Sequence, residues 1–314
     1  MEDYPKTFGE LEERFSTEAS CLAYLANLRW PEGFRCPKCK HAQAWELSAG
    51  LRECARCGHQ TSVTAGTLFH RTRKPICLWF RVIWLVTSQK NGASALGLQR
   101  SLGIGCYKTA WTWLHKLRRA MVNPHRDRLG GVVYVDEVYV GGPQEGKRGR
   151  GAAGKTLVLI AVEQNGGRTG RVRLSRVADA SAASLEDALR RFVREGSEVR
   201  TDGWRGYLGV ERLGYVHAPV RKTAEIGKDL LPPCHRQAGL LKRWLEGTHQ
   251  GAVSPEHLDY YLDEYTFRFN RRTSSHRGKL FQRLLENAMV IEPSAYKSIV
   301  RGVRGPKIRA DHNM

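Results

Sequence analysis

The segment Val132–Val140, "VVYVDEVYV", is rich in β-branched and aromatic residues and predicts a strand. Two further strand-like runs follow, at residues 156–164 and 170–178. A helix is expected over residues 181–196, and a short strand at residues 198–203 comes after it. Three consecutive strands, a helix and a further strand indicate an α/β layer architecture for this part of the chain.

The loop before the second strand contains "GRGAAGKT" (residues 149–156), which matches the phosphate-loop pattern of nucleotide-binding proteins. That pattern binds phosphate only where a helix follows the loop, because the amides at the helix start point at the phosphate. Here the strand "TLVLIAVEQ" follows instead, so we interpret the loop as a hairpin connection. Its basic residues suit contact with a nucleic-acid backbone: Lys147, Arg148, Arg150 and Lys155.

Two aspartates stand at the ends or in the middle of predicted strands. Asp136 lies inside the otherwise apolar first strand, and Asp202 ends the later short strand in "TDGWRGY". Side chains alternate along a strand, so Asp136 and Glu137 are expected on opposite faces, where one of them must leave the apolar environment or find a cation. Acids at the ends of neighbouring strands are able to converge on a divalent metal ion. Taken singly, each fits a capping or turn residue equally well.

Four of the eight cysteines form two C-x-x-C pairs, Cys36/Cys39 and Cys54/Cys57, with fourteen residues between them. Each such turn points two thiolates at one centre, so the two pairs predict a closed tetrahedral site for structural Zn²⁺. Gly58 suits the positive backbone angle that such a knuckle needs. His59 is a weaker candidate ligand. The other four cysteines have no partner spacing and are interpreted as ordinary small side chains.

The charge of the chain points to a polyanionic partner. Its 314 residues include 51 Lys and Arg against 31 Asp and Glu, which gives a formal net charge of +20. A protein this basic usually binds nucleic acid. The acidic N-terminus shows no secretory signal, and the longest apolar run, "ICLWFRVIWLV", is interrupted by Arg81 and too short for a membrane span. We therefore expect a cytoplasmic, DNA-associated protein without membrane contact.

Three helices are predicted between the zinc site and the α/β region, at about residues 75–90, 95–102 and 106–121. A glycine turn at Gly103 joins the last two, as in helix-turn-helix units that bind DNA. A plain three-helix structural unit gives the same pattern. The basic residues expected to meet DNA from the last helix are Lys108, Lys116 and Arg119.

The C-terminal block "LDYYLDEYTFRFNRR" has Leu258, Tyr261, Leu262 and Tyr265 at helical spacing, which indicates packing against the sheet. The basic residues that follow are candidates for DNA contact: Arg268, Arg271 and Arg272. Phe267, Phe269 and Phe281 lie between and after them, and either stack on DNA or form an aromatic core stripe. The tail after residue 292 is expected to be basic and mobile.

Four segments together resemble insertion-sequence transposases of bacteria, the group with an N-terminal zinc ribbon and a DDE-type catalytic domain of ribonuclease H-like fold. These segments are "RWPEGFRCPKC…CARCG", "YVDEVYVGG", "TDGWRGY" and "LLKRWLEGTHQGAVSPEHLDYYLDEYTFRFNRR". The resemblance implies four parts, with these boundaries: a segment with a zinc ribbon (1–66), a helix-turn-helix-like region (67–122), a DDE-type domain (123–290) and a basic tail (291–314).

The resemblance also implies a set of site residues. Asp136 and Asp202 match the first two metal-binding aspartates of the family, and Lys242 matches a lysine that follows the third position by seven residues. His235 stands at that third position, where many members of the family have glutamate and some have asparagine or histidine. Imidazole is softer than the oxygen ligands that Mg²⁺ prefers but suits Mn²⁺. Glu246 is the substitute third ligand, and Glu264 is a more distant one.

The implied activity is Mg²⁺- or Mn²⁺-dependent DNA cleavage and strand transfer at the inverted repeats of a mobile element and at target DNA. Two element ends have to meet, so a homo-oligomer in a synaptic complex is expected. The alternatives are a zinc-ribbon and helix-turn-helix regulator with an inactive catalytic domain, and a nuclease of similar fold that cuts without joining.

Overall fold

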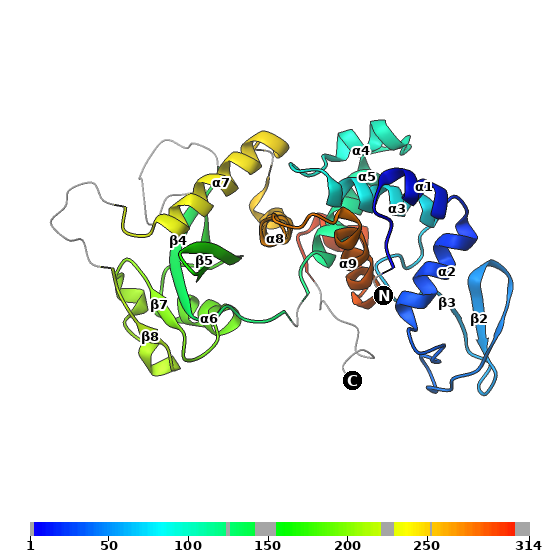
Figure 1. Cartoon of the computed structure of the whole chain (residues 1–314), viewed down its shortest axis with the longest axis horizontal. Coiled ribbons are helices and arrows are strands. Elements are labelled where there is room, and N and C mark those ends of the chain that lie inside the picture. Colours follow the sequence, from blue (N-terminus) through cyan, green and yellow to red (C-terminus); the bar gives the residue numbers. More distant parts are fainter. Residues whose placement is uncertain (1–2, 124–125, 142–154, 221–228, 252, 305–314) are drawn as a thin grey trace. The chain divides into compact units, whose positions relative to one another are not determined.

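The computed structural model describes residues 3–123, 126–141, 155–220, 229–251 and 253–304 (Figure 1). The chain folds as two compact units. The first consists of residues 1–124 together with 274–314, and the second of residues 125–273. Among the described helices, none has the length and apolar character needed to cross a membrane.

A five-stranded mixed sheet with the order β6-β5-β4-β7-β8 forms the centre of the second unit. Its strands are β4 (Val132–Val140), β5 (Thr156–Asn165), β6 (Arg168–Arg176), β7 (Glu198–Arg200) and β8 (Val216–His217). The first three are antiparallel neighbours, whereas β7 runs parallel to β4 and β8 runs parallel to β7. The predicted order of three strands, a helix and a strand is confirmed, and β8 adds a fifth strand that the sequence did not predict.

Helices cover both faces of this sheet. They are α6 (Ala182–Phe192), α7 (Pro232–His249) and α8 (Leu258–Asn270). Val133 and Val135 of β4 pack in one core with α6, while Val158 and Ile160 of β5 pack in a second core with α7 and α8. A strand buried on both faces is apolar almost throughout, which explains why β5 reads as an unbroken apolar run.

The antiparallel pairing of β4 with β5 decides how the loop between them is interpreted. Val140 pairs with Thr156, so the two strands form a hairpin around residues 141–155. β5 starts at Thr156, and no helix follows Lys155 in the described residues 155–165. The hairpin interpretation of "GRGAAGKT" is confirmed, although residues 149–154 themselves lie outside the described residues.

The first unit combines a small zinc-ribbon sheet with helices. Its antiparallel strands are β1 (Ala44–Glu46), β2 (Leu51–Cys54) and β3 (Gln60–Ser62). Its helices before the second unit are α1 (Phe8–Arg14), α2 (Glu18–Arg29), α3 (Ile76–Ser88), α4 (Ala95–Leu102) and α5 (Tyr107–Ala120). The three helices predicted from the sequence correspond to α3, α4 and α5. Gly103 ends α4 with φ 62°, in the left-handed region that favours glycine.

The segment after residue 273 belongs to the first unit, whereas the sequence analysis assigned it up to residue 290 to the catalytic domain. Helix α9 (Arg277–Val290) packs against α2, α3 and α5. Phe281 is fully buried there, with its ring centroid 5.4 Å from that of Phe80 and 5.9 Å from that of Trp84. The apolar stripe of α9 therefore completes an aromatic core begun by residues two hundred positions earlier.

The tail expected to be mobile is structured over part of its length. Helix α10 (Tyr296–Val300) packs against α5, and Ile299 is fully buried. The prediction that the tail is mobile after residue 292 is corrected for this stretch, because a single apolar anchor is enough to dock a short helix. Residues 305–314 lie outside the described residues.

Candidate functional site

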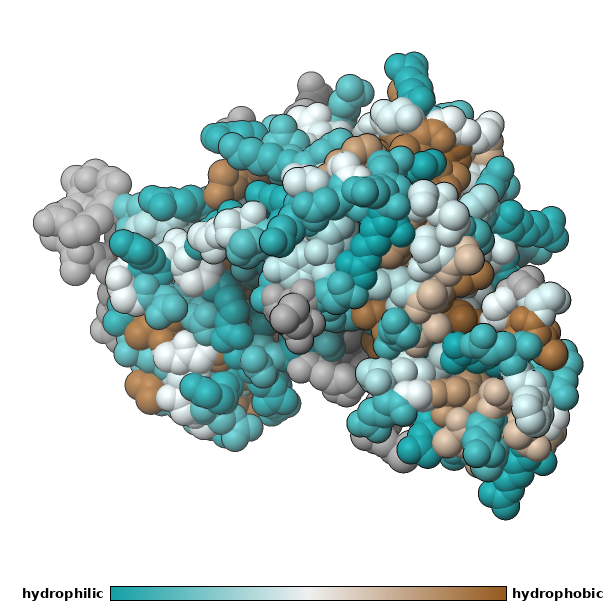
Figure 2. All heavy atoms as spheres, turned by 45° about the vertical axis from the view of Figure 1, so that its right-hand side comes forward, coloured by the Kyte–Doolittle hydropathy of each residue, from teal (hydrophilic) through white to brown (hydrophobic). Residues whose placement is uncertain are grey.

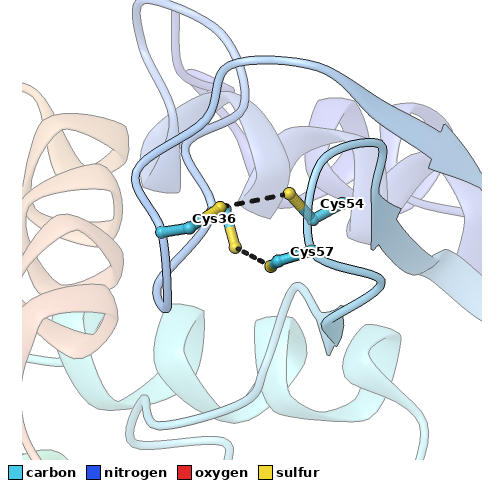
Figure 3. A group of neighbouring side chains, drawn as sticks. Cys36, Cys54 and Cys57 are labelled. Carbon is cyan, nitrogen blue, oxygen red and sulfur yellow. Dashed lines mark hydrogen bonds between the residues drawn. The ribbon is translucent and has the colours of Figure 1, made fainter.

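The four predicted zinc ligands converge in the first unit. The Sγ atoms of Cys36 and Cys57 are 3.7 Å apart and those of Cys39 and Cys54 are 3.5 Å apart (Figure 3). All four Sγ atoms lie within 4.8 Å of one another. A tetrahedron with Zn–S bonds of about 2.3 Å has sulfur atoms roughly 3.8 Å apart. The spacing and the donor type therefore fit a structural Zn²⁺ ion held by four thiolates.

Each cysteine pair sits on a knuckle of the same design. The Lys40 N–H donates to Cys36 O at 2.9 Å, and the Gly58 N–H donates to Cys54 O at 3.0 Å. Both donors have left-handed backbone angles, φ 62° at Lys40 and φ 63° at Gly58. The predicted role of Gly58 is confirmed. His59 accepts the Cys54 N–H through its carbonyl oxygen, and the group of close ligand atoms consists of the four thiols.

Of the two predicted catalytic aspartates, Asp136 lies within β4, and Asp202 follows β7, the parallel neighbour of β4, by two residues. The last pair in the β4/β7 register joins Tyr134 to Arg200. Continued at the same offset, two residues beyond this last pair, the register would bring Asp202 level with Asp136. The chain after β7 is still extended at this point, because the Val220 N–H donates to Thr201 O at 2.8 Å. We therefore expect the two carboxylates to lie near each other, where the chain leaves β7 beside β4.

Electrostatics agree with this placement. Burial raises the pKa of Asp136, and the nearby charge of Asp202 raises it further, against the opposing effects of the Glu137 N–H and of His235. The Glu137 N–H donates to Asp136 Oδ1 at 2.9 Å. Asp202 is exposed, and its Oδ1 accepts the Trp204 N–H at 2.9 Å in the glycine turn. A partly buried carboxylate close to a second acid is an environment that a cation would stabilise.

His235 projects from the first turns of α7 onto Asp136. Its Nε2 atom is 3.2 Å from Asp136 Oδ2. The helix begins after Leu231 with Pro232 and Pro233 in its first turn, where their missing N–H groups cost nothing. Because α7 packs on the face of the sheet that Asp136 occupies, the histidine reaches the carboxylate directly.

Glu137 points to the opposite face of β4, as strand alternation requires. It is half-buried, and the buried Tyr207 hydroxyl donates a hydrogen bond to its Oε1. Burial, together with this carboxylate, raises the pKa of Tyr207 well above its usual value. The two neighbouring acids are thus separated: Asp136 meets a histidine on the α7 side, and Glu137 meets a tyrosine on the α6 side.

The other candidates from the late block lie apart from Asp136. Lys242 and Glu246 are exposed on α7. At 1.5 Å per residue, Glu246 lies about 16 Å further along the helix than His235, which is too far to share one ion with Asp136. Glu264 is fully buried and pairs with Arg268 at 2.7 Å. Among the three possibilities left open by the sequence, His235 is the residue that contacts Asp136.

Asp136, Asp202 and His235 do not form a group of ligand atoms as close as that of the four cysteines. Within the described residues, the four cysteines are the one group of three or more such side chains whose ligand atoms all lie within 4.8 Å of one another. The donor atoms of Asp136, Asp202 and His235 therefore form an open arrangement rather than a closed tetrahedron.

The basic residues predicted on α5 differ in their exposure. Lys108 is exposed, and its Nζ lies 4.1 Å from the centroid of the Tyr296 ring of α10. Lys116 is half-buried, and burial lowers its pKa. Arg119 is only 3% exposed and donates to Ser294 Oγ and to Glu292 O. Arg119 is therefore a packing residue of the first unit, because the C-terminal segment covers the helix side on which it lies.

The arginines of the second unit are held by the fold. Arg268 pairs with buried Glu264, and Arg271 stacks over Phe267 with 4.2 Å to the ring centroid. Arg272 is exposed, stacks over Phe269 and donates to Thr169 O. Lys155 is half-buried at the start of β5. The remaining basic candidates of that hairpin lie outside the described residues: Lys147, Arg148 and Arg150.

The aromatic residues of the late block are mostly core residues. Phe267 and Phe281 are buried at 2% and 0% exposure, so the core interpretation holds for them and they are not available to stack on DNA. Phe269 is half-buried and supports Arg272.

The sequence analysis missed two contacts. Asp229 Oδ1 lies 2.5 Å from His235 Nδ1, so the imidazole stands between two carboxylates. Cys21 and Cys77, interpreted as unrelated small side chains, have their Sγ atoms 3.0 Å apart between α2 and α3. Neither pair has a spacing in the chain that signals contact, and only the packing of helices brings each together.

Two segments of the chain match known protein families. Residues 16–60 match the family described as a transposase zinc-ribbon domain, and residues 128–270 match the ISXO2-like transposase domain. The chain is also 26% identical over 300 residues to a Halobacterium salinarum protein described as "Uncharacterized protein in transposable element ISH50". That alignment covers 88% of this chain and 98% of the relative. The resemblance to insertion-sequence transposases with a zinc ribbon is confirmed.

Proposed function

We propose that this protein is a DNA transposase that binds the terminal inverted repeats of its own insertion sequence and cleaves and rejoins DNA at Asp136, Asp202 and His235. The observation that carries the proposal is the juxtaposition of these residues: the Asp202 charge acts on Asp136, and the His235 Nε2 atom is 3.2 Å from Asp136 Oδ2. The transposase family matches over both units support the same conclusion.

The proposed fold of the second unit is ribonuclease H-like. Three antiparallel strands, a helix, and two strands parallel to the first support it, since this order puts the first strand beside the fourth at the sheet centre. Asp136 comes from the first of these strands and Asp202 from the chain just after the fourth, and the proposed third ligand comes from a helix packed on the sheet.

The side chains present fit divalent metal ions. Two carboxylates supply the hard oxygen donors that Mg²⁺ prefers, and the imidazole of His235 also suits Mn²⁺. Asp136, Asp202 and His235 would together hold the pair of divalent ions that two-metal phosphoryl-transfer sites use.

When bound, the divalent ions would activate the attacking water or 3′-hydroxyl and neutralise charge on the leaving oxygen. Asp136 and Asp202 would hold this centre on a rigid sheet, and His235 would complete it from α7. Exposed Lys242, two helical turns beyond His235, would hold a phosphate near the scissile bond as a point charge. No covalent link between protein and DNA is needed.

DNA binding would use the first unit together with exposed cations of the second. The zinc ribbon, the α4–α5 pair and Lys108 are proposed to contact the inverted repeat, and Arg272 the flanking or target DNA. These contacts are mostly with phosphates, which position the protein on the duplex. Joining two element ends requires two active sites, so we propose that the chain acts as a homo-oligomer in a synaptic complex.

A cleavage assay on labelled terminal-repeat DNA with Mg²⁺ or Mn²⁺ tests the proposal. Wild-type protein is expected to nick and join the ends. Asp136→Ala and Asp202→Ala are each expected to lower the cleavage rate at least 100-fold. Asp187→Ala removes an exposed acid that pairs with Arg191 on α6, and is expected to retain full activity as the matched control.

Two results would contradict it. Binding of the repeat without cleavage by the wild type, unaffected by alanine at Asp136 and Asp202, would instead identify a DNA-binding regulator. Cleavage without joining of an offered 3′-hydroxyl end would identify a nuclease. Inverted repeats flanking the gene, bracketed by short direct repeats, would support the mobile element.

A further inference from the structure

Asp229 lies immediately before α7 and is fixed there by the backbone. Its Oδ1 atom accepts the Leu231 N–H at 3.0 Å, which ties the side chain to the start of the helix. The same oxygen is 2.5 Å from His235 Nδ1. The carboxylate therefore stands at a fixed position against one nitrogen of the imidazole, while the other nitrogen faces Asp136.

The two contacts of the imidazole are unequal. The Nδ1 contact, at 2.5 Å, is shorter than the Nε2 contact with Asp136, at 3.2 Å. A neutral imidazole has one N–H and one lone pair, and the N–H goes to the better-placed acceptor. Both carboxylates accept one backbone N–H, so it is the shorter contact that makes Asp229 the better-placed acceptor for a proton on Nδ1.

We propose that Asp229 is a positioning residue that keeps the proton of His235 on Nδ1 and so leaves the Nε2 lone pair available to a divalent ion held together with Asp136. This inference rests on the proposed function. It gives the site a carboxylate–histidine–metal arrangement, in which an outer carboxylate fixes the tautomer and the ring orientation of the ligand. A carboxylate ligand has no tautomer to select, whereas a histidine at this position needs an outer partner that fixes which ring nitrogen carries the proton.

The tautomer of His235 is measured directly by ¹⁵N NMR of the Mg²⁺-saturated protein at pH 8, with the resonance assigned by its loss in His235→Gln. The Nδ1–H form is expected in the wild type. Asp229→Ala is expected to shift the ring toward the Nε2–H form. Asp229→Asn keeps an oxygen at the same place and is expected to retain the wild-type tautomer. An Nε2–H or doubly protonated ring in the wild type would overturn the inference, whether or not any variant folds.

Affinity for Mn²⁺ alone, without DNA, gives a second readout. Loss of an outer partner of this kind costs about 10–100-fold in metal affinity, and that is the weakening expected for Asp229→Ala. In a His235→Ala background the same substitution is expected to have no further effect, because Asp229 acts through the histidine. An equal loss in both backgrounds would contradict the positioning role.

Asp179→Ala is the matched control. Asp179 Oδ1 accepts the Ser181 N–H at 3.0 Å just before α6, so it makes the same turn at a helix start without a histidine. Mn²⁺ affinity is expected to be unchanged in this variant. If wild-type Mn²⁺ binding is insensitive to Asp136→Ala, the proposed metal site itself fails. If it depends on Asp136 but not on Asp229, only the present inference fails.

Discussion

Two neighbouring acidic residues of strand β4 lie on opposite faces of the sheet and have different partners. Asp136 and Glu137 are consecutive, yet the first faces α7 and meets His235, and the second faces α6 and receives the Tyr207 hydroxyl. The twofold period of a strand makes this separation unavoidable. It places Asp136 in the proposed site and gives Glu137 a neutral partner that stabilises it inside the fold.

Glu163 is a third acidic residue of the sheet, and its contacts are structural. Its two carboxylate oxygens accept hydrogen bonds from the Arg171 side chain at 2.8 and 2.9 Å and from the Gly130 N–H at 3.0 Å. Burial would raise the pKa of Glu163, but these hydrogen bonds outweigh it and lower the pKa. A lowered carboxyl pKa stabilises the fold above the unfolded-state value and loses that effect as the pH falls through the folded-state value.

Glu163→Gln is therefore expected to lower the free energy of unfolding at pH 7 by about 1–2 kcal/mol, since hydrogen bonds to a charged group are replaced by weaker ones. The difference from wild type should shrink below about pH 4, where the wild-type carboxyl is also protonated. Urea unfolding at both pH values measures it. Exposed Glu195 provides the control, Glu195→Gln. A deficit that stays constant down to pH 3 would argue against a charge effect.

At the scale of elements, the short strands of the three-stranded sheet need a source of stability besides packing. The strands β1 and β3 have three residues each, and a three-stranded sheet of this size buries little apolar surface. Its local core consists of Phe34 with the cysteines, and Trp30 and Ala44 pack against it. Binding of Zn²⁺ to the four thiolates would supply the stability that packing does not.

Removal of zinc is expected to unfold this ribbon and leave the second unit folded. Wild-type protein should release one Zn²⁺ per chain to a chelator, with loss of the amide protection of residues 34–62 in hydrogen exchange. Cys54→Ser should purify with little zinc and the same local loss. Cys106 is exposed and outside the group, so Cys106→Ser is the control. Full zinc content in Cys54→Ser would show that the ligand set is wrong.

Elements far apart in the chain are joined within the first unit. Helix α9 supplies Phe281 to an aromatic core that includes Phe15 and Phe80, whose ring centroids are 4.8 Å apart. The hydrophobic stripe of α9 is visible in the sequence, but an amphipathic helix does not name the surface that it covers. This is why the domain boundary at residue 290 was misplaced.

For the molecule as a whole, the excess of positive charge is the property that bears most directly on binding to a polyanion. Hydrophilic side chains cover much of the face drawn in Figure 2, with apolar residues in scattered groups. A formal charge of +20 raises the local concentration of DNA around the protein before any specific contact forms. Several of the arginines are used inside the fold, as Arg119 and Arg268 are, so the charge available for phosphates is smaller than the count.

Binding to duplex DNA is accordingly expected to weaken steeply with salt. If about six phosphates are neutralised, the association constant should fall roughly 10³-fold between 50 and 200 mM salt. Fluorescence anisotropy with labelled duplex measures the slope of log K against log salt. Lys108→Ala should make this slope shallower by about one ion, whereas buried Arg118 or Arg119 are not suitable probes. A slope near zero would exclude phosphate contacts as the main source of affinity.

The sequence by itself determined the succession of three strands, a helix and a strand along the chain and the four cysteines that converge, and it singled out the two aspartates as candidates. These follow from local signals: a two-residue period, C-x-x-C spacing, and acids placed in or after apolar strands, together with a family resemblance. Only the tertiary structure decided which helix reaches Asp136, that Asp229 contacts His235, and that α9 and α10 belong with the N-terminal helices. The reason is physical: a residue pattern fixes which face of an element is buried, but the partner on that face is selected by packing among elements distant in the chain.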